Sequence, residues 1–94
     1  MPTHLFTENE IMEQVSGWKF RDNGIELEIK FTDFIKAFSF MTSIALMAEK
    51  ADHHPEWSNV YNKVKIRWST HSAGGVTVKD IKMAKAINEM IKSI

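Results

Sequence analysis

A β-hairpin is predicted near the start of the chain, because residues 18–31 alternate between apolar and polar side chains around an Asp22-Asn23-Gly24 turn. Asp, Asn and Gly tolerate the positive φ angles that tight hairpin turns require. A period of two puts successive side chains on opposite faces of a strand. We therefore expect strands at 18–21 and 25–31, with one face buried and the other in water.

A second hairpin is predicted at residues 57–68. The segment 57–61 is rich in strand-forming residues, and Asn62-Lys63 is a plausible turn. Apolar and polar side chains then alternate again over 64–68. Two hairpins supply four strands, and consecutive hairpin strands pair antiparallel, so the sequence predicts a four-stranded antiparallel sheet.

The first and last helices are predicted from capping boxes. In this motif a threonine caps the helix, and a carboxylate three residues later bonds back to the capping residue. Thr7 and Glu10 have this spacing before a short helix that ends near Val15, and Thr77 and Asp80 have it before the last helix. The spacing makes capping the simplest role for Asp80.

A long helix is predicted between the hairpins, capped by Thr32 and running to about Lys50. Its apolar residues cover about half of its circumference, more than one core contact needs. A second apolar stripe predicts a helix contact between copies of the chain, as a homodimer or homotetramer; a deeply buried core helix is the alternative. One stripe consists of Phe34, Phe38, Met41, Ala45 and Ala48, and the other of Ala37, Phe40, Ile44 and Met47.

The predicted order is helix, strand, strand, helix, strand, strand, helix. Hairpins separated by helices are typical of an α+β fold, with the three helices packed on one face of the sheet. With 94 residues, the chain is expected to form a single domain over 1–94.

Charge and composition argue against several classes of protein. Lys and Arg together number 12, as do Asp and Glu, so the formal net charge is zero and does not favour a nucleic-acid or membrane partner. The sequence contains no cysteine, which excludes disulfides and thiolate chemistry. Residues 1–6 do not resemble a signal peptide, and residues 34–48 are too short and polar to span a bilayer. We therefore expect a cytoplasmic protein.

Three of the four histidines, His53, His54 and His71, lie in two loops that can meet at one end of the sheet. Imidazole is suited to proton transfer near neutral pH. Asp52 and Glu49 lie close enough in sequence to orient an imidazole. These residues predict an acid–base site, although adjacent histidines in a loop are also common on solvated surfaces.

A zinc site is the alternative chemical interpretation, since three histidines can hold catalytic zinc. Adjacent residues such as His53 and His54 point to opposite sides of an extended chain, so the pair is a poor chelate. The spacing to His71 matches no standard zinc motif. We therefore expect no metal at this site.

Longer segments of the sequence resemble the pterin-4a-carbinolamine dehydratase family, and the similarity covers most of the chain from Trp18 to the last helix. The element order fits the fold of that family. Arg67 and Trp68 make the second hairpin more basic and more aromatic than expected for the family. The segments that carry the resemblance are Glu49-Lys-Ala-Asp-His-His-Pro-Glu-Trp57, Asn59-Val-Tyr-Asn-Lys-Val64, Ser69-Thr-His71, Gly75-Val-Thr77, Asp80 and Ala84.

The resemblance implies dehydration of 4a-hydroxytetrahydrobiopterin to quinonoid dihydropterin without a metal or organic cofactor, in tetrahydrobiopterin recycling. It implies a homo-oligomer, and animal members also bind a homeodomain transcription factor. We hypothesise that His53 and His71 share the acid and base roles and that His54 orients the pterin, with Asp52 or Glu49 setting imidazole tautomers. The implied substrate-binding residues are Asp52, His53, His54, Pro55, Trp57, Ser69, Thr70, His71 and Ser72, with Glu49 and Asp80 in support.

Three alternative functions remain open. The first is a protein-interaction module on the same fold with little catalysis, and the second is a metal-dependent hydrolase built on the three histidines. The third is a nucleic-acid binder, against which the zero net charge counts. Its contacts would come from Lys63, Lys65, Arg67 and Trp68.

Overall fold

The predicted α+β fold and its element order are confirmed in the structure, a computed structural model that describes residues 3–93. Within these residues no helix is long and apolar enough to cross a membrane. The elements are α1 (Glu8–Gln14), β1 (Lys19–Arg21), β2 (Gly24–Lys30), α2 (Phe34–Ala51), β3 (Glu56–Val60), β4 (Lys63–Trp68), the short 3₁₀ helix η1 (His71–Ala73) and α3 (Val78–Lys92).

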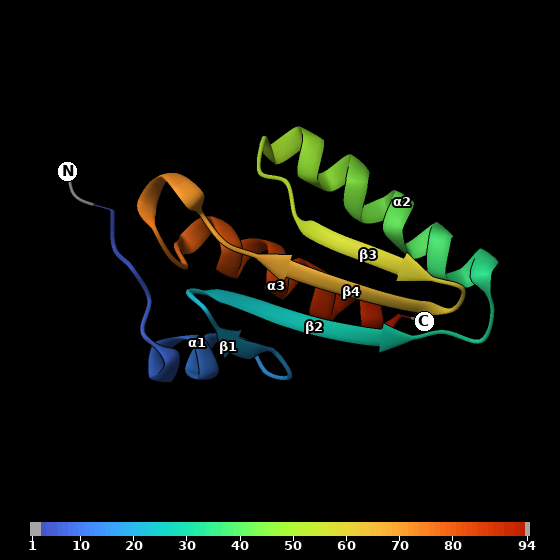
Figure 1. Cartoon of the computed structure of the whole chain (residues 1–94), viewed down its shortest axis with the longest axis horizontal. Helices are drawn as coiled ribbons and strands as arrows, with labels where there is room; N and C mark the ends of the chain where they lie inside the picture. Colours follow the sequence, from blue (N-terminus) through green and yellow to red (C-terminus); the bar gives the residue numbers. More distant parts are fainter. Residues whose placement is uncertain (1–2, 94) are drawn as a thin grey trace.

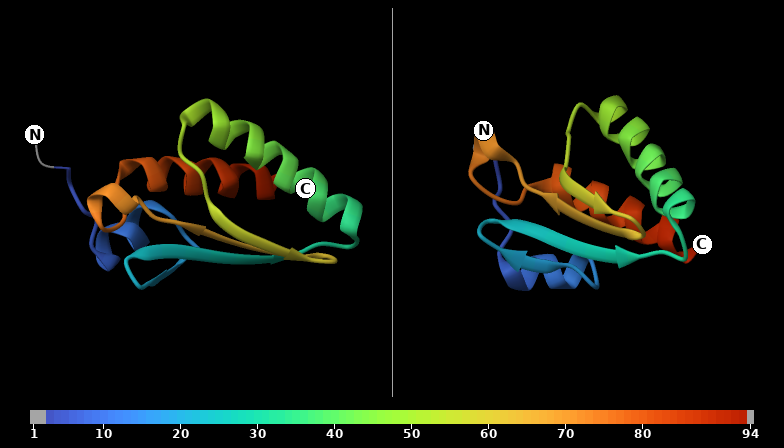
Figure 2. Two further views of the ribbon diagram at one scale, coloured as in Figure 1. Left: turned by 45° about the horizontal axis from the view of Figure 1, so that its top comes forward. Right: turned by 45° about the vertical axis from the view of Figure 1, so that its right-hand side comes forward.

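The four strands form one antiparallel sheet in the order β1-β2-β4-β3. The two hairpins join through β2 and β4, where Leu27 lies opposite Ile66. Helices α2 and α3 lie over the same face of this sheet (Figures 1 and 2), and α1 lies near β1, where it contacts α3. The end of α2, the start of β3, the end of β4 and the start of α3 therefore meet at one end of the sheet (Figure 1).

The core lies between the sheet and its helices. Alternate residues of β4 point into it, as the period of two predicts, while the residues between them lie on the open face. Burial of these apolar side chains is the main favourable term in folding. The buried core residues include Ile25, Val64, Ile66 and Trp68 of the sheet, Ala37, Phe40, Ile44 and Ala48 of α2, and Ile81, Ala84 and Ile87 of α3.

Several predicted boundaries, those of the strands included, shift by one residue. Asp33 caps α2 in place of Thr32, because the Asp33 carboxylate accepts a hydrogen bond from the Lys36 backbone N–H at 2.8 Å. The turn between β3 and β4 begins at Tyr61, which has a positive φ of 52°. Helix α2 continues to Ala51, and Asp52 ends it in the left-handed conformation, which shortens the loop that carries the adjacent histidines.

One apolar stripe of α2 is buried and the other is largely exposed. Ala37, Phe40 and Ile44 of the second predicted stripe lie in the core. Phe34 and Phe38 of the first stripe are exposed. The alternative of a deeply buried core helix is therefore wrong for the chain as a monomer, and an apolar surface is left on α2.

Candidate functional site

His53 lies at the end of the sheet in contact with Asp80 at the start of α3. The His53 Nε2 atom is 2.6 Å from Asp80 Oδ1, and the two side chains are 11% and 0% exposed. Asp80 Oδ2 accepts hydrogen bonds from the Thr70 hydroxyl at 2.7 Å and the Thr77 backbone N–H at 2.9 Å. A buried carboxylate is costly unless it is hydrogen-bonded, and these three contacts meet that requirement.

Asp80 therefore has two structural roles, of which the capping pattern indicated the first, while the family resemblance implied only an unspecified supporting role in the site. It completes the predicted capping box of α3, and it also holds the His53 imidazole. Of the carboxylates expected to orient imidazoles, Glu49 contacts His54, as described below. Asp52 is the left-handed residue that ends α2, and within residues 3–93 its side chain forms no hydrogen bond or ion pair.

The His53 ring stacks on the indole of Trp68, with ring centroids 5.4 Å apart and an interplanar angle of 23°. Trp68 is fully buried at the end of β4, so it gives the imidazole a rigid apolar surface. The Trp68 Nε1–H has no hydrogen-bond partner within residues 3–93. An aromatic face can also stabilise a protonated imidazole by a cation–π interaction.

His54 points away from this buried contact. Its Nε2 atom lies 2.8 Å from Glu49 Oε1, and both side chains are exposed. Neighbouring side chains on an extended chain project to opposite sides, and Pro55 favours that extended geometry for His54. The adjacent histidines therefore meet different environments, one nearly buried and one in solvent.

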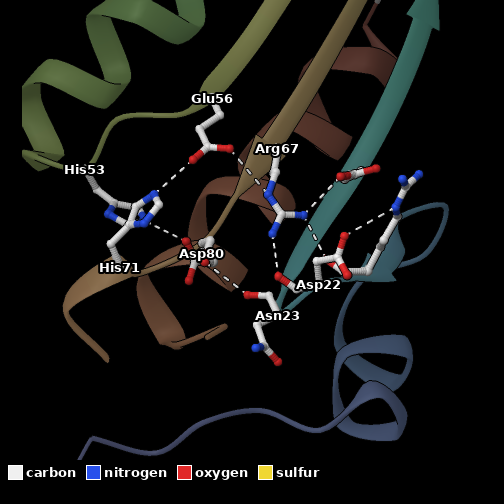
Figure 3. A network of polar contacts seen from close by, with 10 residues as sticks. Asp22, Asn23, His53, Glu56, Arg67, His71 and Asp80 are labelled. Atoms are coloured by element: carbon white, nitrogen blue, oxygen red, sulfur yellow. Dashed lines mark hydrogen bonds and ion pairs between the residues drawn. The ribbon is translucent and has the colours of Figure 1, made fainter. Parts of the chain in front are cut away.

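His71 belongs to η1 and pairs with Glu56, the first residue of β3. The His71 Nε2 atom is 2.9 Å from Glu56 Oε1, and the His71 side chain is 80% exposed. Figure 3 shows this contact together with the one between His53 and Asp80. Glu56 was not among the predicted site residues, although it lies in a segment that resembles the family and at the edge of the histidine loop.

Hydrogen bonds and chain connectivity bring His53 and His71 to the same end of the sheet. Asp80 contacts both His53 and Thr70, and Thr70 directly precedes His71. Glu56, which contacts His71, is only three residues after His53. In each of the two imidazoles Nε2 faces a carboxylate, which leaves Nδ1 available to another partner.

The remaining predicted substrate-binding residues lie in different environments. Thr70 is buried and bonded to Asp80 and Thr77, so its hydroxyl supports the network. The Ser69 hydroxyl donates to the Asn23 carbonyl at 3.0 Å. Trp57 is partly buried against the core. Ser72 is exposed and lines a cavity of about 320 Å³, whose other lining residues include Lys79.

Within residues 3–93, no group of three His, Cys, Asp or Glu side chains is arranged to hold a metal ion. His53, His54 and His71 each contact a different carboxylate instead. A pair of an imidazole and a carboxylate is suited to moving a proton, because the carboxylate orients the ring and can stabilise its protonated form.

Comparisons with known proteins identify the family of this chain. The sequence profile of the family described as "Pterin 4 alpha carbinolamine dehydratase" matches residues 4–90. A Prochlorococcus marinus (strain MIT 9515) protein, provisionally named pterin-4-alpha-carbinolamine dehydratase, is 50% identical over 95 residues, covering 98% of this chain and 99% of that protein. A Rhodopseudomonas palustris (strain HaA2) protein with the same provisional name is 49% identical over 81 residues, covering 84% and 80%.

A solved structure gives the same result. The crystal structure described as transcriptional coactivator/pterin dehydratase from Brucella melitensis is 47% identical in sequence and has a TM-score of 0.85. The similarity covers 92% of this chain and 97% of that one. Because the profile and these relatives match nearly the whole sequence, the chain belongs to the pterin-4a-carbinolamine dehydratase family.

Proposed function

We propose that this protein is a lyase that dehydrates pterin-4a-carbinolamine to quinonoid dihydropterin and water, using His53 and His71 for general acid–base catalysis. Its physiological role would be the recycling of tetrahydrobiopterin. The observation that carries the proposal is the 2.6 Å contact between a nearly buried imidazole, His53, and a fully buried carboxylate, Asp80. Membership of the family supplies the class of substrate.

The reaction needs one proton delivered and one removed. The C4a–O bond breaks as its hydroxyl accepts a proton and leaves as water. The neighbouring ring nitrogen loses its proton, and that electron pair forms the new C=N bond. One imidazole in its protonated form and one in its neutral form supply both transfers, and catalysis of this kind contributes typically 10²–10⁴-fold in rate.

Each of the three histidines is oriented by a different carboxylate. Asp80 accepts from His53 Nε2 and so directs Nδ1 toward a substrate, as Glu56 does for His71. Asp80 is thus a positioning residue, because it acts on the substrate through His53. His54, which is exposed beside Glu49, would orient the pterin from the solvent side.

The test is the rate of conversion of 4a-hydroxytetrahydropterin, followed by ultraviolet absorbance and corrected for spontaneous dehydration. His53→Ala and His71→Ala should each lower kcat by about 10²-fold or more, because each removes a proton-transfer group. His4→Ala is the matched control, since His4 contacts Glu10 in the N-terminal segment. Full activity in His71→Ala would refute the assigned roles, and an inactive wild-type protein would refute the function.

We also propose that the exposed stripe of α2 joins copies of the chain into a homodimer or homotetramer. Phe34 and Phe38 of this stripe are exposed, and so are Ile35 and Leu46 elsewhere on α2; exposed apolar groups of this kind mark interaction surfaces. Sedimentation analysis of the wild type and of Phe38→Glu tests this proposal. A wild-type monomer at micromolar concentration would contradict it.

A second function, as a protein-interaction module, draws support from the description of the Brucella melitensis relative as a coactivator as well as a dehydratase. In this protein the exposed stripe of α2 is the surface available for such a partner. A protein that forms stable oligomers through α2 and has full dehydratase activity would favour the enzymatic function over this one.

A further inference from the structure

Arg67 lies between two carboxylates on the open face of the sheet. In the strand register it is opposite Glu26 of β2 on one side and opposite Glu56 of β3 on the other. Side chains directly opposite each other on neighbouring strands interact, and opposite charges stabilise the pair. The three residues therefore form a row of charges, negative, positive and negative, that ends at Glu56 near the candidate site.

The guanidinium group of Arg67 has an oxygen partner at every nitrogen. Nη1 donates to Glu26 Oε2 at 3.0 Å and to the Arg21 carbonyl at 2.8 Å, and Nη2 donates to the Asp22 carbonyl at 2.6 Å. Nε lies 3.4 Å from Glu56 Oε2. The planar fork of arginine suits several fixed acceptors at once, and the side chain is only 18% exposed.

The hairpin turn between β1 and β2 is shaped to receive this group. Asp22 and Asn23 both have positive φ angles, which defines a tight turn, and the carbonyls of Arg21 and Asp22 face Arg67. At Gly24, a Cβ atom would lie 2.5 Å from the guanidinium carbon of Arg67. The absence of a side chain at Gly24 therefore leaves the space that Arg67 occupies.

Glu56 connects this fixed group to His71. One carboxylate oxygen, Oε2, faces Arg67, and the other, Oε1, faces His71 Nε2 at 2.9 Å. Both Glu56 and His71 are exposed, and η1 is a helix of only three residues. An exposed ion pair holds its side chains weakly when nothing else restrains them. Figure 3 shows that Arg67 reaches Glu56 from the side opposite to His71.

We propose that Arg67 is a positioning residue for His71, acting through Glu56. By holding one oxygen of Glu56, it restricts the carboxylate to orientations in which the other oxygen meets His71 Nε2 and directs Nδ1 toward the substrate. This inference rests on the proposed role of His71 in dehydration. It also gives the hairpin turn, which lies outside the histidine loops, a part in arranging the site.

A double-mutant cycle with Arg67→Gln and Glu56→Gln tests the proposal. Each single variant should lower kcat roughly tenfold, as expected for groups coupled in one network, and the double variant should lose no more than either single variant. Lys65→Gln is the matched control, since it removes a positive charge from the same face of β4, two residues from Arg67. Independent, multiplying losses of kcat in the cycle would overturn the proposal.

A spectroscopic measurement separates positioning from stability. Long-range ¹H–¹⁵N spectra of the histidine rings report the tautomer and hydrogen bonding of each imidazole. Arg67→Gln should shift the His71 signals and leave those of His54 unchanged. If Arg67→Gln lowered only the thermal unfolding temperature, with the His71 signals and kcat as in the wild type, Arg67 would be a structural residue and the proposal would be wrong.

Gly24→Ala provides a second variant in which Arg67 and all charges remain. The added methyl group should displace the guanidinium, so this variant should shift the His71 ring signals in the same direction as Arg67→Gln. If Arg67→Gln does not fold, Gly24→Ala still tests whether Arg67 positions His71. Unchanged His71 signals in Gly24→Ala would contradict the proposal. The ring spectra need no substrate, so an inactive wild type would refute the proposed function while the spectra still decided the role of Arg67.

Discussion

The two capping boxes of this protein have the same chemistry in opposite environments. At the start of α1, the Thr7 N–H donates to Glu10 Oε1, and His4 Nε2 lies 3.0 Å from Glu10 Oε2. At the start of α3, the Thr77 N–H donates to one oxygen of Asp80, and the other oxygen meets His53.

Burial is what separates the two capping boxes. Glu10 and His4 are 40% and 61% exposed, whereas Asp80 is completely buried. At the surface, water can replace either the carboxylate or the imidazole as a hydrogen-bonding partner at little cost in free energy. Their contact there is therefore weak. In the core, the carboxylate has no water to replace a lost partner. A motif that only caps the start of a helix at the surface can therefore hold a side chain such as His53 rigidly in the interior.

The largest expected difference is in stability. Asp80→Ala should lower the free energy of unfolding by about 3 kcal/mol, because it leaves the buried Thr70 hydroxyl and Thr77 N–H without their acceptor. Glu10→Ala should have a much smaller effect, since water can replace the exposed carboxylate. Denaturant unfolding of both variants measures the difference, and equal losses would show that burial does not distinguish the two capping boxes.

The next difference is in activity. Asp80→Asn keeps the shape of the side chain but changes how it bonds to His53, so the imidazole loses its fixed tautomer. We expect kcat to fall on the order of 10²-fold or more, as when an orienting carboxylate is replaced by an amide. Glu10→Gln makes the same chemical change in the surface capping box and should leave kcat at the wild-type value. The steady-state dehydration assay compares Asp80→Asn with Glu10→Gln. A wild-type kcat in Asp80→Asn would show that Asp80 does not position His53 for catalysis.

The smallest expected effect concerns pH and the surface capping box. The backbone N–H of Thr7, followed by the His4 side chain, holds the pKa of Glu10 below its usual value of 4.5. A carboxyl whose pKa is lowered by folding adds stability that is present above the unfolded pKa and is lost as the pH falls through the folded pKa.

This linkage predicts how Glu10→Gln should behave. The wild type should be slightly more stable than the variant near pH 6, and the difference should shrink as the pH falls below about 4.5. Urea unfolding curves between pH 3 and 6 provide the measurement. A difference that grew on acidification would have the wrong sign for a lowered pKa.

Much of the fold could be predicted from local patterns. Alternation identified both hairpins, and threonine–carboxylate spacing identified the starts of α1 and α3. The errors were also local, since Asp33 caps α2 in place of Thr32 and the second turn begins at Tyr61. Both residues at the start of α2 can act as caps, and the choice between them depends on how the chain leaves the sheet.

The partners of the histidines were harder to predict. His53 contacts Asp80, 27 residues away, and His71 contacts Glu56, 15 residues away. The carboxylates expected to orient imidazoles were near neighbours in the chain, Asp52 and Glu49, and of these only Glu49 contacts a histidine, His54. Asp80 was implied as a supporting residue, but its contact with His53 was not predicted. No role for Arg67 in the histidine site was predicted, because its two carboxylate partners are brought to it by strand pairing.

The sequence by itself determined the order of the elements, the two equivalent capping boxes and the three candidate histidines, because each depends on residues a few positions apart. Only the tertiary structure decided that one capping box is buried against His53 and that the other faces solvent. The reason is physical: the strength of a contact between a carboxylate and an imidazole depends on how much water surrounds it, and packing of α3 against the sheet removes that water from Asp80.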